Sequence, residues 1–171
     1  IYHTLVLKED GSLWTTGRNH YDQLGDGTNL DRSNLQMIVP SGVESVAACG
    51  YHSLFVKSDG SLWGFGNNAH GELGLGDKTN RLTPTRILTD GVKQVISGVY
   101  HSLFIKSDGS LWGMGDNRDG QLGNNLKSYY LEPIQINAGE MVSAAGGYYH
   151  NAYVNADGSL WTIGKNNYGQ L

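Results

Sequence analysis

Histidine is the side chain whose spacing first suggests chemistry, because it recurs at a fixed interval of 49 residues, at His3, His52, His101 and His150. Four imidazoles at one radius of a symmetric ring could surround a metal ion. The same periodicity, however, repeats any structural residue, and the metal-binding spacings C-x-x-C and H-E-x-x-H are absent. We therefore predict structural histidines that bond nearby backbone, and neither a metal site nor a cofactor.

Tryptophan recurs at the same interval, at Trp14, Trp63, Trp112 and Trp161. Each one lies between a leucine and a small residue in a short β-prone run. A large ring in that position most simply fills the space between packed layers. With one tryptophan in each repeat, there is no surplus that would indicate a chromophore. We therefore expect Trp63 and Trp112 to be mostly buried.

Glycine-rich segments related to Asn-x-x-Gly-Gln-Leu-Gly follow the tryptophans. A phosphate-binding loop needs a Lys-Ser/Thr pair and a following helix, and neither is present, so these segments predict turns. Cys49 takes a position that Gly98 and Gly147 hold in later repeats, which predicts a small, buried and inert thiol. No Cys-His or Ser-His-Asp arrangement stands apart from the repeat, so we predict that the protein is not an enzyme.

Composition narrows the class of protein. The 171 residues include 25 glycines and 10 tyrosines, and 16% are charged and 39% hydrophobic. This argues against a helical bundle or coiled coil, and the hydrophobic content argues against disorder. A net charge of -4 without a basic run argues against a nucleic-acid partner. No apolar run approaches the ~18 residues of a membrane-spanning helix, so no membrane partner is expected.

Asp-Gly pairs define the elements that position these residues. They recur between two short β-prone runs, at Asp10, Asp59, Asp108 and Asp157. Such a pair is a strong signal of a tight β-hairpin, so residues 3–8 should pair antiparallel with residues 12–17. Two weaker strands follow in each repeat, and prolines begin the first of them, at Pro84 and Pro133. Four antiparallel strands per 49 residues predict an all-β fold, a β-propeller or propeller segment of four-stranded blades.

The chain holds three full repeats and part of a fourth. We assign residues 1–171 to a single propeller segment, with repeats 3–51, 52–100 and 101–149 and a partial repeat 150–171. An open arc of this kind leaves an apolar face at each end. Three arrangements would cover these faces: missing blades of a longer protein, a second copy in a homodimer, or closure as a four-bladed ring.

The repeat resembles a known family. The segments Tyr51–Phe55, Asp59–Asn68 and Gly71–Gly74 resemble the regulator-of-chromosome-condensation repeat, in particular its bacterial, alpha-tubulin-suppressor-like branch. The first repeat departs from the pattern at Asp22, where the others have glycine. The resemblance covers the whole chain and implies a propeller of which this chain is about half. It implies no particular activity, because family members include exchange factors, ubiquitin-ligase modules, a light receptor and secreted inhibitors.

Residues that differ between the repeats carry more functional information than those that recur, because binding chemistry need not repeat. They lie in and after the glycine-rich turn of each repeat. Loops on a rigid scaffold commonly carry binding, and tyrosine and arginine are enriched in binding hot spots. The candidate partner-binding residues are His20, Tyr21, His70, Arg118, Asp119, Tyr129, Tyr130 and Tyr168.

These observations predict a non-catalytic interaction scaffold that binds a protein partner through one propeller face. A guanine-nucleotide exchange factor for a small GTPase is a second hypothesis, but such proteins usually carry a wedge loop, and the unbroken period leaves no insertion. A secreted inhibitor or surface-binding array is a third hypothesis. A lone cysteine fits a reducing compartment without excluding an oxidising one, so the sequence assigns no location.

Overall fold

The computed structural model describes residues 2–171, which form strands and no helix. Residues 2–171 therefore contain no helix that is long and apolar enough to cross a membrane. The strands form four sheets, which we name blades 1 to 4. Blade 2 contains β4 (Val43–Cys49), β5 (His52–Lys57), β6 (Leu62–Gly66) and β7 (Arg81–Leu88). Blade 3 contains β8 (Val92–Ser97), β9 (His101–Lys106), β10 (Leu111–Asp116) and β11 (Tyr129–Asn137).

The first and last blades have three strands each within the described residues. Blade 1 contains β1 (His3–Leu7), β2 (Leu13–Gly17) and β3 (Arg32–Val39). Blade 4 contains β12 (Met141–Gly146), β13 (His150–Asn155) and β14 (Leu160–Gly164). The predicted pairing of residues 3–8 with 12–17 is confirmed, because β1 pairs antiparallel with β2 from His3↔Gly17 to Leu7↔Leu13.

The Asp-Gly turn explains why these segments form hairpins. Gly60 has a φ of 77°, in the left-handed region that favours glycine. Beside it, Asp59 Oδ1 accepts hydrogen bonds from the backbone N–H of Ser61 at 2.9 Å and from its hydroxyl at 2.5 Å. The Ser61 hydroxyl oxygen then accepts the indole N–H of Trp63 at 2.8 Å. The same bonds recur in blade 3, at Asp108, Ser110 and Trp112.

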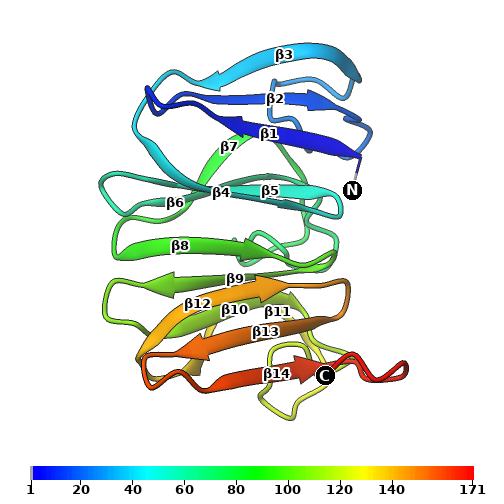
Figure 1. Cartoon of the computed structure of the whole chain (residues 1–171). Coiled ribbons are helices and arrows are strands. Elements are labelled where there is room, and N and C mark those ends of the chain that lie inside the picture. Colours follow the sequence, from blue (N-terminus) through cyan, green and yellow to red (C-terminus); the bar gives the residue numbers. More distant parts are fainter. Residues whose placement is uncertain (1) are drawn as a thin grey trace.

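The blades stack face to face. Their first strands contact one another, β4 with β8 and β8 with β12. Each of these strands comes from one sequence repeat and pairs with a hairpin from the next, which ties successive repeats together. The stack confirms the predicted all-β propeller architecture. Blades 1 and 4 lie at opposite ends of it (Figure 1), so the chain does not close as a four-bladed ring in this structure.

Strand β5 shows how the blades pack on both faces. Leu54 and Val56 join one buried cluster with Phe104 of blade 3, whereas Phe55 joins a second buried cluster with Leu13 of blade 1. Alternate side chains of one strand therefore enter two different interblade cores. Because neighbouring blades cover both faces of this strand, its consecutive side chains are apolar and do not alternate with polar ones, as expected for a sheet that is buried on both faces.

Two prolines lie inside strands rather than at their starts, so that prediction is wrong. Pro84 lies within β7 and Pro133 within β11. Between Arg81 and Thr85 the register of β7 against β6 shifts, and Pro84 falls in this interval. The register of β11 shifts in the same way around Pro133. Proline is tolerated there because a bulge in an edge strand does not require its missing N–H.

Two further predictions of burial have different outcomes. Trp63 and Trp112 are mostly buried, as predicted: each packs against a buried interblade cluster and keeps only part of its ring at the surface. Trp63 stacks on Phe55 with ring centroids 6.1 Å apart, and Phe55, which is fully buried, fills the space between blades. The Lys57 ammonium lies 4.7 Å from the Trp63 ring centroid. Cys49, which we predicted to be buried, is only half-buried. It ends β4, which is an edge strand of its sheet.

Both ends of the stack expose apolar side chains. In blade 1, Trp14 is half-buried and its cross-strand neighbour Met37 is 55% exposed. In blade 4, Leu160 is 67% and Trp161 is 55% exposed. No fourth strand of blade 4 covers Trp161 within the described residues. What covers these two faces stays a prediction.

Candidate functional site

The site candidates lie at one end of the blades. Antiparallel pairing places the start of β5 beside the end of β6, as in the pair His52↔Gly66, so the turn before β5 and the loop after β6 share that end. We name it the Tyr rim, because each blade presents a tyrosine there, at Tyr2, Tyr51, Tyr100 and Tyr149. The Asp-Gly turns form the opposite end, the Asp rim. The Tyr rim is on the right in Figure 1, where both termini lie.

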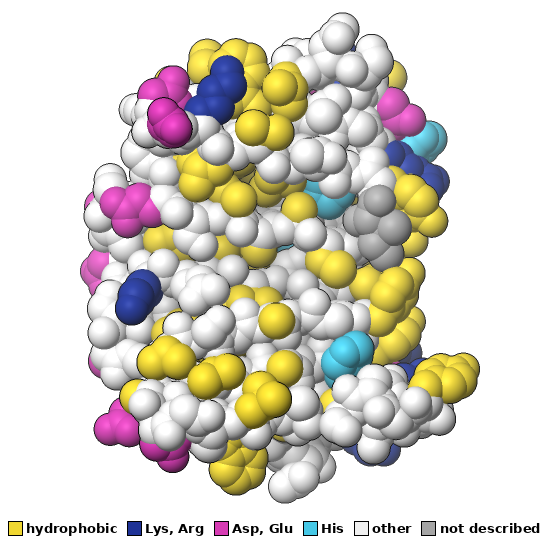
Figure 2. Space-filling view, viewed as in Figure 1, with side chains coloured by type: hydrophobic (Ala, Val, Ile, Leu, Met, Phe, Trp, Pro, Cys, Tyr) yellow, Lys and Arg dark blue, Asp and Glu magenta, His cyan; other side chains and the backbone are white. Residues whose placement is uncertain are grey.

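Tyrosines from several blades form a row along the Tyr rim. The ring centroids of Tyr51 and Tyr100 are 6.1 Å apart, and those of Tyr100 and Tyr149 are also 6.1 Å apart. Tyr21 extends the row at 4.8 Å from Tyr51, and Tyr148 extends it at 5.5 Å from Tyr149. Figure 2 shows hydrophobic side chains gathered along this side of the molecule. We name these five residues the tyrosine row.

Four of the predicted partner-binding residues join or flank the row. Tyr21 is a member of it. The His70 ring lies 4.8 Å from that of Tyr100 and 5.4 Å from that of Tyr129. The Arg118 guanidinium lies 4.9 Å from the centroid of Tyr129. The structure therefore brings residues from three loops into one aromatic cluster.

The loop carboxylates beside this cluster hold His70 and Arg118 in place. Glu72 Oε1 lies 3.0 Å from Nδ1 of His70. Asp116 Oδ2 accepts a hydrogen bond from Arg118 at 2.8 Å. Burial alone would raise the pKa of the Asp116 carboxyl, but the hydrogen bonds from Arg118 hold that pKa below its usual value. These two carboxylates are therefore occupied by groups of the same rim.

The other four predicted residues lie apart from the cluster. Tyr130 packs against the core of blades 3 and 4, and its hydroxyl accepts a hydrogen bond from Asn124. His20 is exposed and lies 3.5 Å from an aspartate of its own loop. Asp119 is half-buried in the loop after β10. Tyr168 is 91% exposed and makes no ring contact within the described residues.

The sequence pattern does not single out Tyr51, Tyr100 and Tyr149 as site residues, because they recur as scaffold residues do. The available signal is their position immediately before each repeated histidine. His52 and His101 are fully buried, whereas the tyrosine before each of them is only partly buried. Repetition thus produced a row of rings at the surface.

The pKa values of two phenol groups in the tyrosine row, Tyr100 and Tyr148, are raised. Burial, and then the nearby phenols of Tyr149 and Tyr51, raises the pKa of Tyr100 above its ordinary value. Burial and the phenols of Tyr51 and Tyr2 raise the pKa of Tyr148 in the same way. Within residues 2–171, no protein group is hydrogen-bonded to a hydroxyl of the row. The row therefore offers free O–H groups to a partner.

Beneath the row, the histidines link neighbouring blades. His52 Nε2 lies 2.8 Å from the hydroxyl oxygen of Ser102 in blade 3. That hydroxyl donates its proton to the backbone carbonyl of Glu72 at 2.7 Å. His52 Nε2 must therefore carry a proton and donate it to Ser102, which defines the neutral tautomer. The predicted bond from histidine to nearby backbone is wrong, because the partner is a side chain of the next blade.

The same link occurs at the other interblade contacts. His3 bonds Ser53 and His101 bonds Asn151, each at 2.8 Å. Burial lowers the pKa of His52 to about 3 and that of His3 to about 4, and it also lowers the pKa of His101. Within residues 2–171, no group of three histidine, cysteine, aspartate or glutamate side chains could hold a metal ion. The histidines act as neutral connectors in this geometry.

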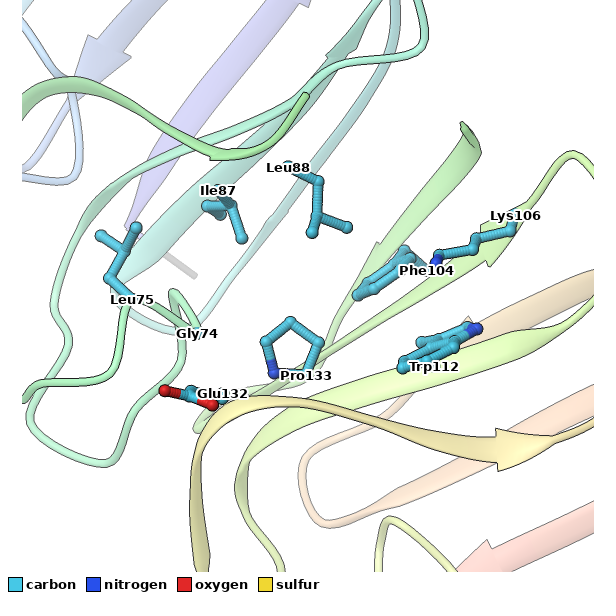
Figure 3. Close-up of a pocket in the computed structure, with 9 residues that line it drawn as sticks. All are labelled: Gly74, Leu75, Ile87, Leu88, Phe104, Lys106, Trp112, Glu132 and Pro133. Carbon is cyan, nitrogen blue, oxygen red and sulfur yellow. The ribbon is translucent and has the colours of Figure 1, made fainter. Parts of the chain in front are cut away.

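A cavity of about 380 Å³ lies between blades 2 and 3 and was not anticipated from the sequence. Figure 3 shows Ile87 and Leu88 on one side of it and Phe104 and Trp112 on the other. Of the 9 residues that line it, only Lys106 and Glu132 are charged. No serine, cysteine or histidine lines the cavity, and the Lys106 ammonium lies 4.2 Å from the ring centroid of Trp112. The complete lining is Gly74, Leu75, Ile87, Leu88, Phe104, Lys106, Trp112, Glu132 and Pro133.

Stacked antiparallel blades with a 49-residue period define a β-propeller repeat protein. The family model described as the Regulator of chromosome condensation (RCC1) repeat matches residues 59–105 and 108–154. A second model with the same description matches residues 1–23, 43–72, 92–121 and 141–170. The chain belongs to the RCC1 repeat family, as the sequence resemblance implied. A sequence search of curated proteins gave no significant match.

Solved structures share this fold. Human WBSCR16 is 27% identical, with a TM-score of 0.82 over 95% of this chain. Prp20p from Saccharomyces cerevisiae, described with its binding properties to Gsp1p and histones, is 25% identical, with a TM-score of 0.85 over 99% of this chain. Yeast RCC1 (Prp20) bound to Kap60 is 23% identical, with a TM-score of 0.82 over 96%, and shows the fold alone. The chain spans 45%, 44% and 42% of these three proteins, less than half of each.

Proposed function

We propose that this chain is part of a non-catalytic interaction scaffold that binds a protein partner through the Tyr rim. The observation that carries the proposal is the tyrosine row, five rings from several repeats that lie close to one another on the rim of rigid, buried sheets. Aromatic side chains held on a rigid frame are typical anchors of protein interfaces. Prp20p, which shares the fold, is described as binding Gsp1p and histones, and this supports a binding role for the scaffold.

The chemistry of the remaining groups supports binding rather than catalysis. Each interblade histidine, His3, His52 and His101, uses its Nε2 atom to bond a side chain of the next blade, which is a structural role. The cavity between blades 2 and 3 is lined mainly by apolar side chains and by no serine, cysteine or histidine. In this proposal residues 1–171 act as one propeller segment, and missing blades or a second copy of the chain cover its two apolar end faces.

Affinity capture with the full-length protein tests the proposal. One variant combines Tyr51→Ser with Tyr100→Ser, and a matched control combines Lys57→Ser with Lys106→Ser on the Asp rim. The wild type and the control should recover similar amounts of the same partner proteins. The tyrosine variant should recover about tenfold less or lower still, which corresponds to a loss of ~1.4 kcal/mol or more of binding free energy. Circular dichroism should show that both variants are folded. Equal recovery with all three proteins would contradict the proposal.

A further inference from the structure

Two cations of the Tyr rim, Arg18 and Lys165, have no carboxylate partner within the described residues. The Arg18 guanidinium lies 5.4 Å from the ring centroid of Tyr2, and the Lys165 ammonium lies 4.9 Å from that of Tyr149. The backbone also ties each cationic residue to its tyrosine. The N–H of Arg18 donates to the carbonyl of Tyr2, and that of Lys165 donates to the carbonyl of Tyr149. Within residues 2–171, neither cation forms an ion pair. By contrast, three arginines of the same loops do, Arg32 with Asp26, Arg81 with Asp77 and Arg118 with Asp116.

The same surface carries further hydrogen-bond donors without a protein partner within the described residues. The five hydroxyls of the tyrosine row lack protein partners within the described residues, and Lys78 extends a further unpaired ammonium over Tyr129 at 4.5 Å. Most nearby carboxylates are occupied by a cation or a histidine. Asp22 and Asp119 are the exceptions that form no ion pair. A partner that supplies several carboxylates would complete this surface.

The spacing of the row suits an extended chain. Successive rings from Tyr51 to Tyr100 to Tyr149 are 6.1 Å apart. An extended segment advances about 3.3 Å per residue and directs every second side chain to the same side, so its like-facing side chains recur at about 6.6 Å. The separation of neighbouring rings in the row therefore matches the separation of like-facing side chains in an extended segment.

We infer that the Tyr rim binds an extended, acidic segment of a protein partner. Carboxylates on alternate residues of that segment accept hydrogen bonds from the hydroxyls of Tyr51, Tyr100 and Tyr149. Arg18 and Lys165 meet the charges toward its two ends. A basic segment would instead place its cations against Arg18 and Lys165, and this repulsion disfavours it. The inference rests on the proposed scaffold function and names the class of partner for the same rim.

The test uses two fluorescein-labelled peptides of about ten residues, long enough for the row at about 3.3 Å per residue. One alternates glutamate with threonine, and the other alternates lysine with threonine. Fluorescence anisotropy with the full-length protein at low salt should show binding of the glutamate peptide and not of the lysine peptide. The double variant Arg18→Gln and Lys165→Gln should weaken this binding about tenfold or more, and so should a triple phenylalanine variant at Tyr51, Tyr100 and Tyr149.

A matched control separates the rim from charge in general. Lys57→Gln with Lys106→Gln removes two cations that also lie over aromatic rings, but at the Asp rim, and it should leave the affinity unchanged. Absence of glutamate-peptide binding, equal binding of the lysine peptide, or equal loss in this control would overturn the inference. If partner capture depends on the tyrosines while the glutamate peptide fails, the scaffold function stands and only the acidic class of partner is wrong.

Discussion

The Tyr rim and the Asp rim are two ends of the same strands, yet they satisfy their polar groups in opposite ways. At the Asp rim each turn closes on itself, because Asp59 accepts from Ser61 and Ser61 accepts from Trp63. At the Tyr rim the phenol hydroxyls of the row have no protein partner within the described residues. Figure 2 shows most of the acidic side chains of this face on its left side, whereas hydrophobic ones lie along its right side and across its middle. The difference teaches that one rim completes the fold, whereas the other leaves groups free for a partner.

The largest expected effect is a loss of stability, and it should be larger for an aromatic ring in the interior than for one near the Asp rim. Phe104 is fully buried, and Trp112 stacks on it at 6.3 Å while keeping part of its ring at the surface. Phe104→Ala should lower the free energy of unfolding by about 3–5 kcal/mol, the usual range for a buried aromatic ring. Trp112→Ala should lower it by less than ~3 kcal/mol, because part of the indole is already in water. Urea denaturation measures both, and equal losses would show that Trp112 belongs to the interior.

A smaller effect is expected from the histidines beneath the Tyr rim. His52→Ala removes the donor to Ser102 inside a buried contact. The free energy of unfolding at pH 7 should fall by about 1–3 kcal/mol, the range for leaving a buried polar group without its partner. His150→Ala is the matched comparison, because that ring is only half-buried, and it should have the smaller effect. The reverse order in urea denaturation would argue against the interblade link.

The same histidines make stability depend on pH. Burial lowers the pKa of His52 to about 3 and of His3 to about 4, from an ordinary value of 6.5. Between pH 6.5 and about 4 the unfolded chain therefore binds protons that the folded chain does not. Stability should be complete above pH 6.5 and should decline as the pH falls from there toward 4. The decline should be shallower in His52→Ala, and an unchanged slope would contradict the burial of a neutral imidazole.

The smallest expected effect lies at the Asp rim. Hydrogen bonds from the hydroxyl and backbone N–H of Ser61 lower the pKa of Asp59, so this turn stabilises the fold above pH 3.8 and loses that contribution as the pH falls further. Asp59→Ala should reduce the midpoint of thermal unfolding at pH 7 by less than His52→Ala does. Partner binding should not change. A loss of binding in this variant would show that both rims contact the partner.

The sequence was sufficient for the fold but not for the site. Asp-Gly turns and strict periodicity are local signals, so they predicted the hairpins and the propeller correctly. The partner of His52 depends on a contact between blades, which no local pattern contains. The tyrosine row arises because stacked blades bring distant repeats to 6.1 Å, whereas Tyr130, which varies between repeats, packs into the core instead.

Site-specific photocrosslinking most directly tests whether the Tyr rim contacts the partner. A photoreactive benzoylphenylalanine is introduced at one rim or at the other of the full-length protein. Position Tyr148 is an exposed member of the tyrosine row, and position Asp90 is an exposed residue of the Asp rim. After irradiation with the captured partner, mass spectrometry should find the crosslinked partner for position 148 and not for position 90. Crosslinking from position 90 alone, or equally from both positions, would contradict the claim that the Tyr rim is the binding surface.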